Sequence, residues 1–108
     1  MKLWLDDWRR PVGQGWVWVK DFDECVSMME SQVPEVVSLD HDLGPGPTGY
    51  DVLLWCERNG VWPNTILIHT ANPVGHANMV RCIQASGLYV GNPSQNRYIQ
   101  EAADGKDQ

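Results

Sequence analysis

Short apolar runs that each end in polar residues are the strongest constraint on how this chain can fold. The runs cover residues 2–5, 36–39 and 65–69, and they are followed by Asp6 and Asp7, by Asp40 and by Thr70. Runs this short are typical of strands that are buried on both faces of a parallel sheet. The carboxyl ends of such strands meet at one edge, where open α/β proteins place their sites. Three carboxylates and a hydroxyl at that edge suggest a site for a divalent cation and phosphate.

The rest of the chain alternates further strands with helices. We expect strands over residues 16–19 and 88–90, and helices from Asp21 to before Pro34, over residues 49–58, from Asn72 to about Ser86 and over residues 95–102. Only ten residues separate the first two strands, which is too few for the usual crossover helix. The sequence therefore predicts a loop in place of that helix, and one thinly covered sheet face. One domain should span residues 1–103, followed by a frayed tail over residues 104–108.

Composition limits the classes of function. A chain of 108 residues with 43% hydrophobic content has room for one small packed domain. The net charge of −6 argues against non-specific binding of duplex DNA, which needs basic stripes. The three cysteines fall in apolar helical patterns, as buried thiols do in a reducing cytoplasm. No signal-like segment and no stretch long enough to cross a bilayer is present, so we expect a cytoplasmic protein without a membrane partner.

The polar residues at the strand ends resemble those of the response-regulator receiver domain. Asp6 and Asp7 match that family's metal-binding carboxylates, Asp40 matches its phosphoacceptor, and Thr70 matches its conserved hydroxyl. The resemblance implies a receiver- or flavodoxin-like three-layer sandwich, with five parallel strands in the order 2-1-3-4-5. It also implies a lysine after the fifth strand, but Asn92-Pro93 stands there instead.

Three longer motifs are similar to a narrower family, the cyclic-phosphate-processing receiver domains. The motifs are LWLDDWRRP, SLDHDLG with TGYDVL, and HTANPVG. They contain two histidines, His41 and His69, where receivers usually carry apolar residues. The resemblance implies an activity on cyclic phosphate ends, in RNA repair or in conflict between phage and host.

Strand alternation gives an independent expectation for the two histidines. Successive residues of a strand point to opposite faces, so Asp40 should face Thr70, and His41 should approach His69. A pair of imidazoles can supply the base and the acid that open a cyclic phosphodiester. The pair could instead ligate a transition metal, completed by Asp40 or Asp42. The competing structural interpretation is two buried, hydrogen-bonded imidazoles.

These inferences predict a phosphoesterase that acts on a cyclic phosphate, either at an RNA end or in a cyclic nucleotide. The expected residues are Asp6, Asp7 and Asp40 for Mg²⁺; His41, His69 and Asp42 for catalysis; and Arg9, Thr70, Asn72 and Asn92 for substrate. For Asn72 a helix cap, and for Arg9 a solvated loop charge, are equally good interpretations. The rival hypothesis is a receiver or pseudo-receiver that signals through Asp40 or by docking a partner.

Overall fold

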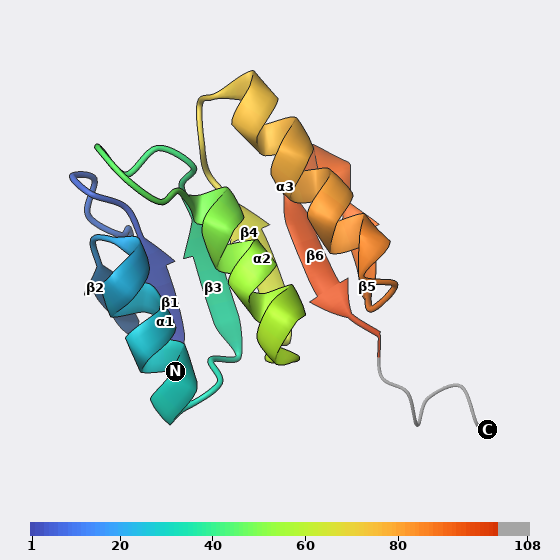
Figure 1. Cartoon of the computed structure of the whole chain (residues 1–108), viewed down its shortest axis with the longest axis horizontal. Helices are drawn as coiled ribbons and strands as arrows, with labels where there is room; N and C mark the ends of the chain where they lie inside the picture. Colours follow the sequence, from blue (N-terminus) through green and yellow to red (C-terminus); the bar gives the residue numbers. More distant parts are fainter. Residues whose placement is uncertain (102–108) are drawn as a thin grey trace.

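The computed structural model of the chain, which describes residues 1–101, is an open β-sheet with three α-helices packed on one face (Figure 1). The strands are β1 (Lys2–Leu5), β2 (Trp16–Val19), β3 (Val36–Leu39), β4 (Thr65–Ile68), β5 (Tyr89–Asn92) and β6 (Arg97–Gln100). The helices are α1 (Phe22–Ser31), α2 (Gly49–Asn59) and α3 (Pro73–Ala85). A 3₁₀ turn, η1 (Pro93–Gln95), joins β5 to β6.

The first four strands and the three helices confirm the predicted elements. β1 pairs in parallel with both β2 and β3, and β3 pairs in parallel with β4. Each helix starts at its predicted capping residue, whose side chain accepts a backbone N–H of the first turn. These caps are Asp21, Thr48 and Asn72. The parallel strands therefore deliver their carboxyl ends to one edge, as the sequence indicates.

The end of the chain differs from the prediction. β6 pairs antiparallel with β4, and β5 pairs antiparallel with β6, so the order is β2-β1-β3-β4-β6-β5 in a mixed sheet. The predicted helix over residues 95–102 is therefore wrong where the structure describes it. Asn96 adopts a left-handed conformation, with φ of 51°, and turns the chain back into β6. Tyr98 is buried there, and its ring lies over Gly91, where a Cβ atom would come within 2.6 Å of it.

The domain has two layers, the sheet and the helices on one of its faces, rather than the predicted three. Leu3 and Leu5 belong to the core between sheet and helices, so Lys2 and Trp4 point to the opposite face. Within residues 1–101 no helix covers that face (Figure 1). The loop predicted in place of the first crossover helix is confirmed, because β2 follows β1 without a helix between them. We call this second surface the open face.

The cysteine prediction is confirmed, since Cys25, Cys56 and Cys82 are buried free thiols. Burial raises the pKa of Cys25 and of Cys56 to about 12, so these thiols stay protonated. In the described part of the chain, no helix has the length and apolar character needed to span a membrane. The predicted tail over residues 104–108 lies outside the described residues.

Strand β6 can be tested by a pair of substitutions. Tyr98→Ala should lower the free energy of unfolding by about 3–5 kcal/mol, because it empties a buried site beside Gly91. Ile99→Ala, on the exposed side of the same strand, should cost much less. Urea denaturation of both variants measures the difference, and equal losses would contradict the assigned alternation.

Candidate functional site

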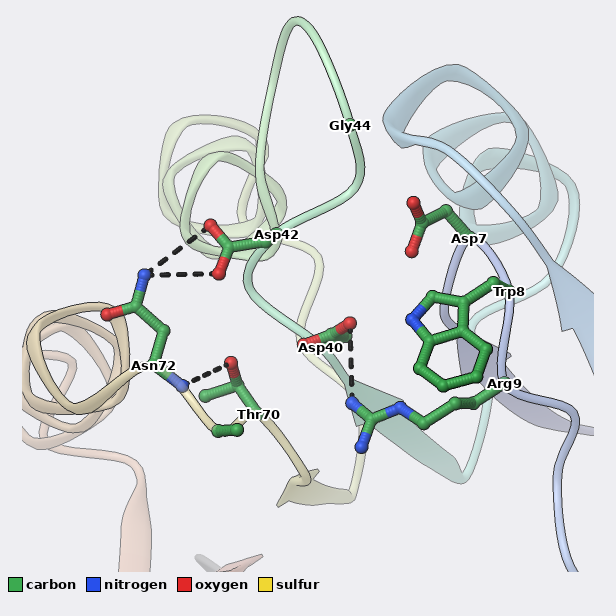
Figure 2. Close-up of a pocket in the computed structure, with 9 residues that line it drawn as sticks. Asp7, Trp8, Arg9, Asp40, Asp42, Gly44, Thr70 and Asn72 are labelled. Atoms are coloured by element: carbon green, nitrogen blue, oxygen red, sulfur yellow. Dashed lines mark hydrogen bonds and ion pairs between the residues drawn. The ribbon is translucent and has the colours of Figure 1, made fainter.

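A pocket lies at the carboxyl edge of the parallel strands (Figure 2). Its volume is about 310 Å³, and its walls come from the loops after β1, β3 and β4. The lining residues are Asp7, Trp8, Arg9, Asp40, Asp42, Gly44, Thr70, Ala71 and Asn72. Six of the ten predicted site residues are among these nine, so the strand ends meet at one pocket.

Asp6 is fully buried behind this pocket. Its Oδ1 accepts the backbone N–H groups of Trp8 and Arg9 at 3.0 and 2.8 Å, and its Oδ2 accepts Arg9 Nε at 3.0 Å. The Oδ2 atom also lies 3.1 Å from His69 Nε2. Burial alone would raise the pKa of Asp6, but these hydrogen bonds and the Arg9 charge keep it below the ordinary value. Asp6 is an ionised carboxylate whose two oxygens are fully engaged by protein donors.

Arg9 is the cation of the pocket. Besides its bond to Asp6, its Nη2 lies 3.5 Å from Asp40 Oδ2 and donates to the backbone oxygen of His69 at 3.2 Å. The side chain keeps 38% of its surface exposed, so the guanidinium is held at the wall and still faces the pocket. Arg9 is therefore fixed in place, which excludes the interpretation of a freely solvated loop charge.

His69 is held by contacts on every side. Its ring stacks on Trp4 with centroids 3.8 Å apart, and its Nδ1 lies 2.7 Å from Ser38 Oγ. Because a carboxylate only accepts, Nε2–H donates to Asp6, and a neutral ring lets Nδ1 accept the Ser38 hydroxyl. Desolvation by burial lowers the pKa of His69, which agrees with the neutral ring. Both nitrogens are thus engaged, and His69 positions Asp6 in this structure.

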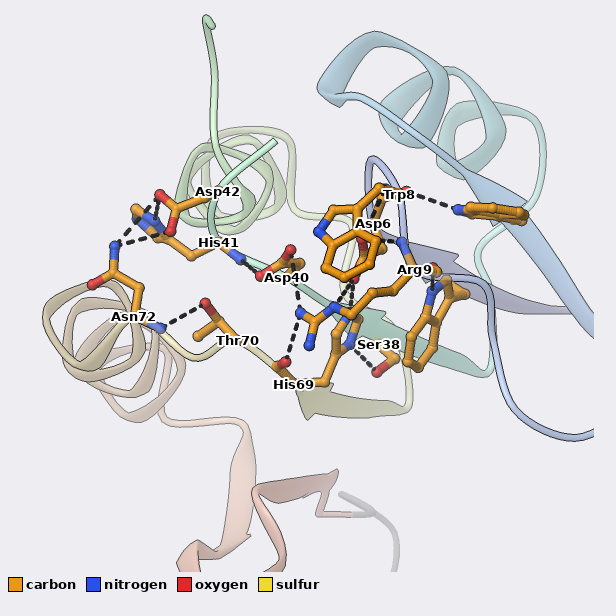
Figure 3. Close-up of polar contacts among 12 residues, drawn as sticks. Asp6, Trp8, Arg9, Ser38, Asp40, His41, Asp42, His69, Thr70 and Asn72 are labelled. Carbon is orange, nitrogen blue, oxygen red and sulfur yellow. Dashed lines mark hydrogen bonds and ion pairs between the residues drawn. The ribbon is translucent and has the colours of Figure 1, made fainter. Parts of the chain in front are cut away.

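His41 points elsewhere, so the expected approach of the two imidazoles is wrong (Figure 3). Its Nδ1 lies 3.1 Å from Asp42 Oδ1, and its ring packs on α3 so closely that a Cβ atom on Gly75 would come within 2.4 Å of it. The strand alternation that we extended to His41 stops at Leu39, where β3 ends. Both imidazoles lie outside the set of residues that line the pocket.

Asp42, Thr70 and Asn72 form the α3 side of the pocket. Asn72 caps α3 through its Oδ1 and donates from Nδ2 to Asp42 Oδ2 at 3.1 Å. Hydrogen bonds from Asn72 and His41 lower the pKa of Asp42. The backbone N–H of Asn72 donates to Thr70 Oγ1 at 3.1 Å, so the threonine proton is available for a bound phosphate oxygen. Asn72 thus acts as a cap that also positions its neighbours.

Asn92 does not reach this pocket. It lies in β5, opposite Arg97 of β6, and lines a different pocket over the C-terminal strands. The expectation that Asn92 contacts substrate assumed that β5 follows β4 directly in the sheet. The insertion of β6 between β4 and β5 places Asn92 one strand further from the pocket.

The residues fit a divalent cation only in part. Ligand atoms of Asp6, Asp40 and His69 lie within 4.8 Å of one another, but the Arg9 guanidinium already contacts all three residues. Of the three carboxylates that line the pocket, Asp42 is bonded to Asn72, whereas Asp7 and Asp40 are the two predicted metal ligands. Mg²⁺ is commonly bound by one or two carboxylates together with substrate phosphates, and this pair fits that mode. The separated imidazoles do not fit a shared transition metal.

The fold and the pocket together define a receiver-like α/β domain with an acidic, arginine-containing site. The sequence profile described as the cyclic-phosphate processing receiver domain matches residues 1–85, and the chain belongs to this family. Searches of curated proteins and of solved structures find no significant match.

Ser38 was missing from the sequence-based assignment. It is the partner of His69, and its signal was a polar residue inside an otherwise apolar run. Trp8, whose place beside the acidic pair suggests a stacking surface for a base, lines the pocket with 73% of its surface exposed.

Substitution of the two adjacent acids should separate their roles. Asp6→Asn should lower the free energy of unfolding by about 3 kcal/mol or more, because it breaks a buried ion pair and places an amide against two donors. Asp7→Asn, which removes the same charge at the pocket wall, should change it by less than about 0.5 kcal/mol. Denaturation curves of the two variants provide the measurement. A similar change in both variants would contradict the distinct roles assigned to the two acids.

Acidification should destabilise the fold through His69. Its pKa in the fold lies below the ordinary 6.5, so the unfolded chain takes up a proton first as the pH falls. The contribution of neutral His69 to the free energy of unfolding is complete above about pH 6.5, and it is lost as the pH falls through the pKa of His69 in the fold. His69→Gln should therefore show a shallower loss of stability than the wild type between about pH 7.5 and 5.5. Equal slopes in urea denaturation would argue against a neutral, buried His69.

Proposed function

We propose that this protein is a phosphoesterase that opens a cyclic phosphate, with its catalytic site in the pocket at the carboxyl edge. The proposal rests on one observation above all. Arg9 and Thr70, which bind phosphate oxygens well, share one small pocket with the carboxylates Asp7, Asp40 and Asp42. The family description, which names cyclic-phosphate processing, supports the same chemistry.

Substrate binding is assigned to Arg9 and Thr70. The Arg9 guanidinium is fixed by Asp6 and lines the pocket, where its positive charge would neutralise the phosphoryl oxygens. The Thr70 hydroxyl accepts from Asn72 and donates its proton to another phosphate oxygen. Both groups strengthen their hydrogen bonds as negative charge builds up during attack, which is how they lower the barrier.

Asp42 is the carboxylate that we assign to the attacking water. It is ionised, and Asn72 and His41 fix its orientation at the pocket wall. Water oxygen forms the new bond to phosphorus and gives its proton to Asp42, while one ester P–O bond breaks. The departing ester oxygen takes a proton from solvent, and the product is a phosphomonoester. His41 is a positioning residue in this scheme, and so is His69, through Asp6.

Asp7 and Asp40 are the residues that would hold a divalent cation. Such a cation, when bound, supplies further neutralisation of the phosphate and lowers the pKa of a coordinated water. Asp40 also accepts the backbone N–H of His41 at 2.8 Å, which keeps its carboxylate directed at the pocket.

Hydrolysis of a nucleoside 2′,3′-cyclic phosphate, followed by chromatography with and without Mg²⁺ or Mn²⁺, tests the proposal. Thr70→Val should lower kcat/KM by roughly 100-fold, the usual effect of losing one transition-state donor. Thr65→Val, at the other end of β4, is the matched control and should retain activity. Turnover that is insensitive to Thr70→Val and to Asp42→Asn would reject this pocket as the catalytic site.

A second candidate function is signalling by phosphorylation of Asp40. The observation that favours it is the Arg9 guanidinium beside Asp40, which can neutralise an acyl phosphate where receivers use a lysine. Incubation with acetyl phosphate and intact-mass measurement distinguishes the two functions. A stable phosphoryl adduct that disappears in Asp40→Asn, without turnover of cyclic phosphates, would favour the receiver function.

A further inference from the structure

The segment between the acidic pair and α1 has an unusual composition. Residues 8–20 contain three tryptophans and three basic residues and no acid, in a chain whose net charge is −6. This segment takes the place of a crossover helix and supplies β2, the edge strand beside β1. The proposed catalytic function uses only Arg9 of it, so most of this charge and aromatic surface is unexplained.

Trp16 and Trp18 of this segment contact three cations on the open face. Trp16 pairs with Lys2 and Trp18 with Trp4 across β1 and β2, so these indoles share the face that lacks helices. Lys2 Nζ lies 4.6 Å from the Trp16 ring. Lys20 Nζ and Arg10 Cζ lie 4.6 and 6.0 Å from the Trp18 ring. Cation–π contacts thus place three exposed or half-exposed charges along the β2 side of the open face.

The open face is tied to the loop that forms one wall of the pocket. The indole N–H of Trp18 donates to the backbone oxygen of Asp6 at 2.7 Å, and that of Trp4 donates to the backbone oxygen of Arg9 at 2.7 Å. Both bonds fix the open-face tryptophans to the loop that carries Trp8 and Arg9. Trp8 presents its exposed indole at the pocket wall (Figure 2), and Arg10 follows it by two residues in the same loop.

We propose that this basic strip, formed by Lys2, Arg10 and Lys20 with Trp8, Trp16 and Trp18, binds single-stranded RNA. The terminal cyclic phosphate of the RNA enters the pocket, and this part of the inference rests on the proposed function. The preceding phosphates contact the strip cations, and the last base stacks on Trp8. Aromatic platforms beside a basic groove are the usual means of binding single strands.

Charge elsewhere in the fold supports this orientation. Helices α1 and α2 carry five acids, namely Asp23, Glu24, Glu30, Asp51 and Glu57, on the other side of the sheet. A polyanion is therefore repelled from the helical layer and attracted to the open face. Stacking on Trp8 requires an unpaired base, which favours a single strand over a duplex. A 2′,3′-cyclic phosphate needs a 2′-hydroxyl, which favours RNA over DNA.

Binding can be measured separately from catalysis. A 5′-labelled RNA 10-mer ending in 2′,3′-cyclic phosphate is titrated with the full chain, without divalent cations, and followed by fluorescence anisotropy at several salt concentrations. The slope of log affinity against log salt is negative, and the double variant Arg10→Gln/Lys20→Gln should make it less steep by about 1.4, since each single-strand phosphate contact contributes about 0.7. Trp8→Ala should weaken binding roughly tenfold through lost stacking.

The matched control is Arg58→Gln/Arg81→Gln, which removes the same charge from α2 and α3. This variant should bind the RNA like the wild type. Equal weakening by the two double variants, or duplex RNA bound as tightly as the single strand, would overturn the inference.

Activity separates this inference from the proposed function. The Arg10→Gln/Lys20→Gln variant should hydrolyse a nucleoside 2′,3′-cyclic phosphate at the wild-type rate, while its KM for the RNA 10-mer rises. Hydrolysis of the nucleoside substrate without strip-dependent RNA binding would overturn the proposal that the strip binds RNA, and it would leave the proposed phosphoesterase function intact. Strip-dependent binding without any hydrolysis would support the strip and count against the phosphoesterase.

Discussion

The site depends on one buried negative charge. The carboxylate of Asp6 joins the loop after β1, the guanidinium of Arg9 and the imidazole of His69, which comes from the end of β4. A charge without solvent is tolerated only when such partners are complete. The same set of bonds fixes Arg9 beside Asp40, and it thereby gives an acidic pocket the positive group that phosphate binding needs. The resemblance to receiver domains marks Asp6 as a metal ligand, but in this structure Asp6 holds the Arg9 guanidinium in place.

The parallel part of the fold could be predicted from the sequence because its signals are local. Short apolar runs mark β1, β3 and β4, and capping residues mark the starts of the helices. Since strand ends share an edge, the meeting of Asp7, Asp40 and Thr70 followed from those runs alone. The position of β6 depends on a long-range pairing with β4, and the four residues of Arg97–Gln100 carry too short a pattern to distinguish a strand from a helix.

The histidines show where pattern reasoning fails at a site. Alternation along a strand gave the correct face for His69, which lies one residue past β4 and is still hydrogen-bonded to β3 through its backbone. It failed for His41, whose chain bends toward α2, where Gly49 donates its N–H to the His41 carbonyl at 2.9 Å. Side-chain direction at the end of a strand depends on the next element, and that packing cannot be inferred from spacing.

The C-terminal hairpin has a consequence for how this family can diversify. The match to the family ends at residue 85, where α3 ends, and β5 and β6 follow it. The hairpin joins the rest of the sheet along β4, and Tyr98 of β6 belongs to the same core as the parallel strands. Its turn lies at the carboxyl edge of the sheet, where the Asn96 carbonyl accepts the backbone N–H of Ile68 at 3.0 Å. A relative with a different C-terminal element would therefore need a substitute for both the core residue Tyr98 and this support of the end of β4, which leads directly to His69 and Thr70.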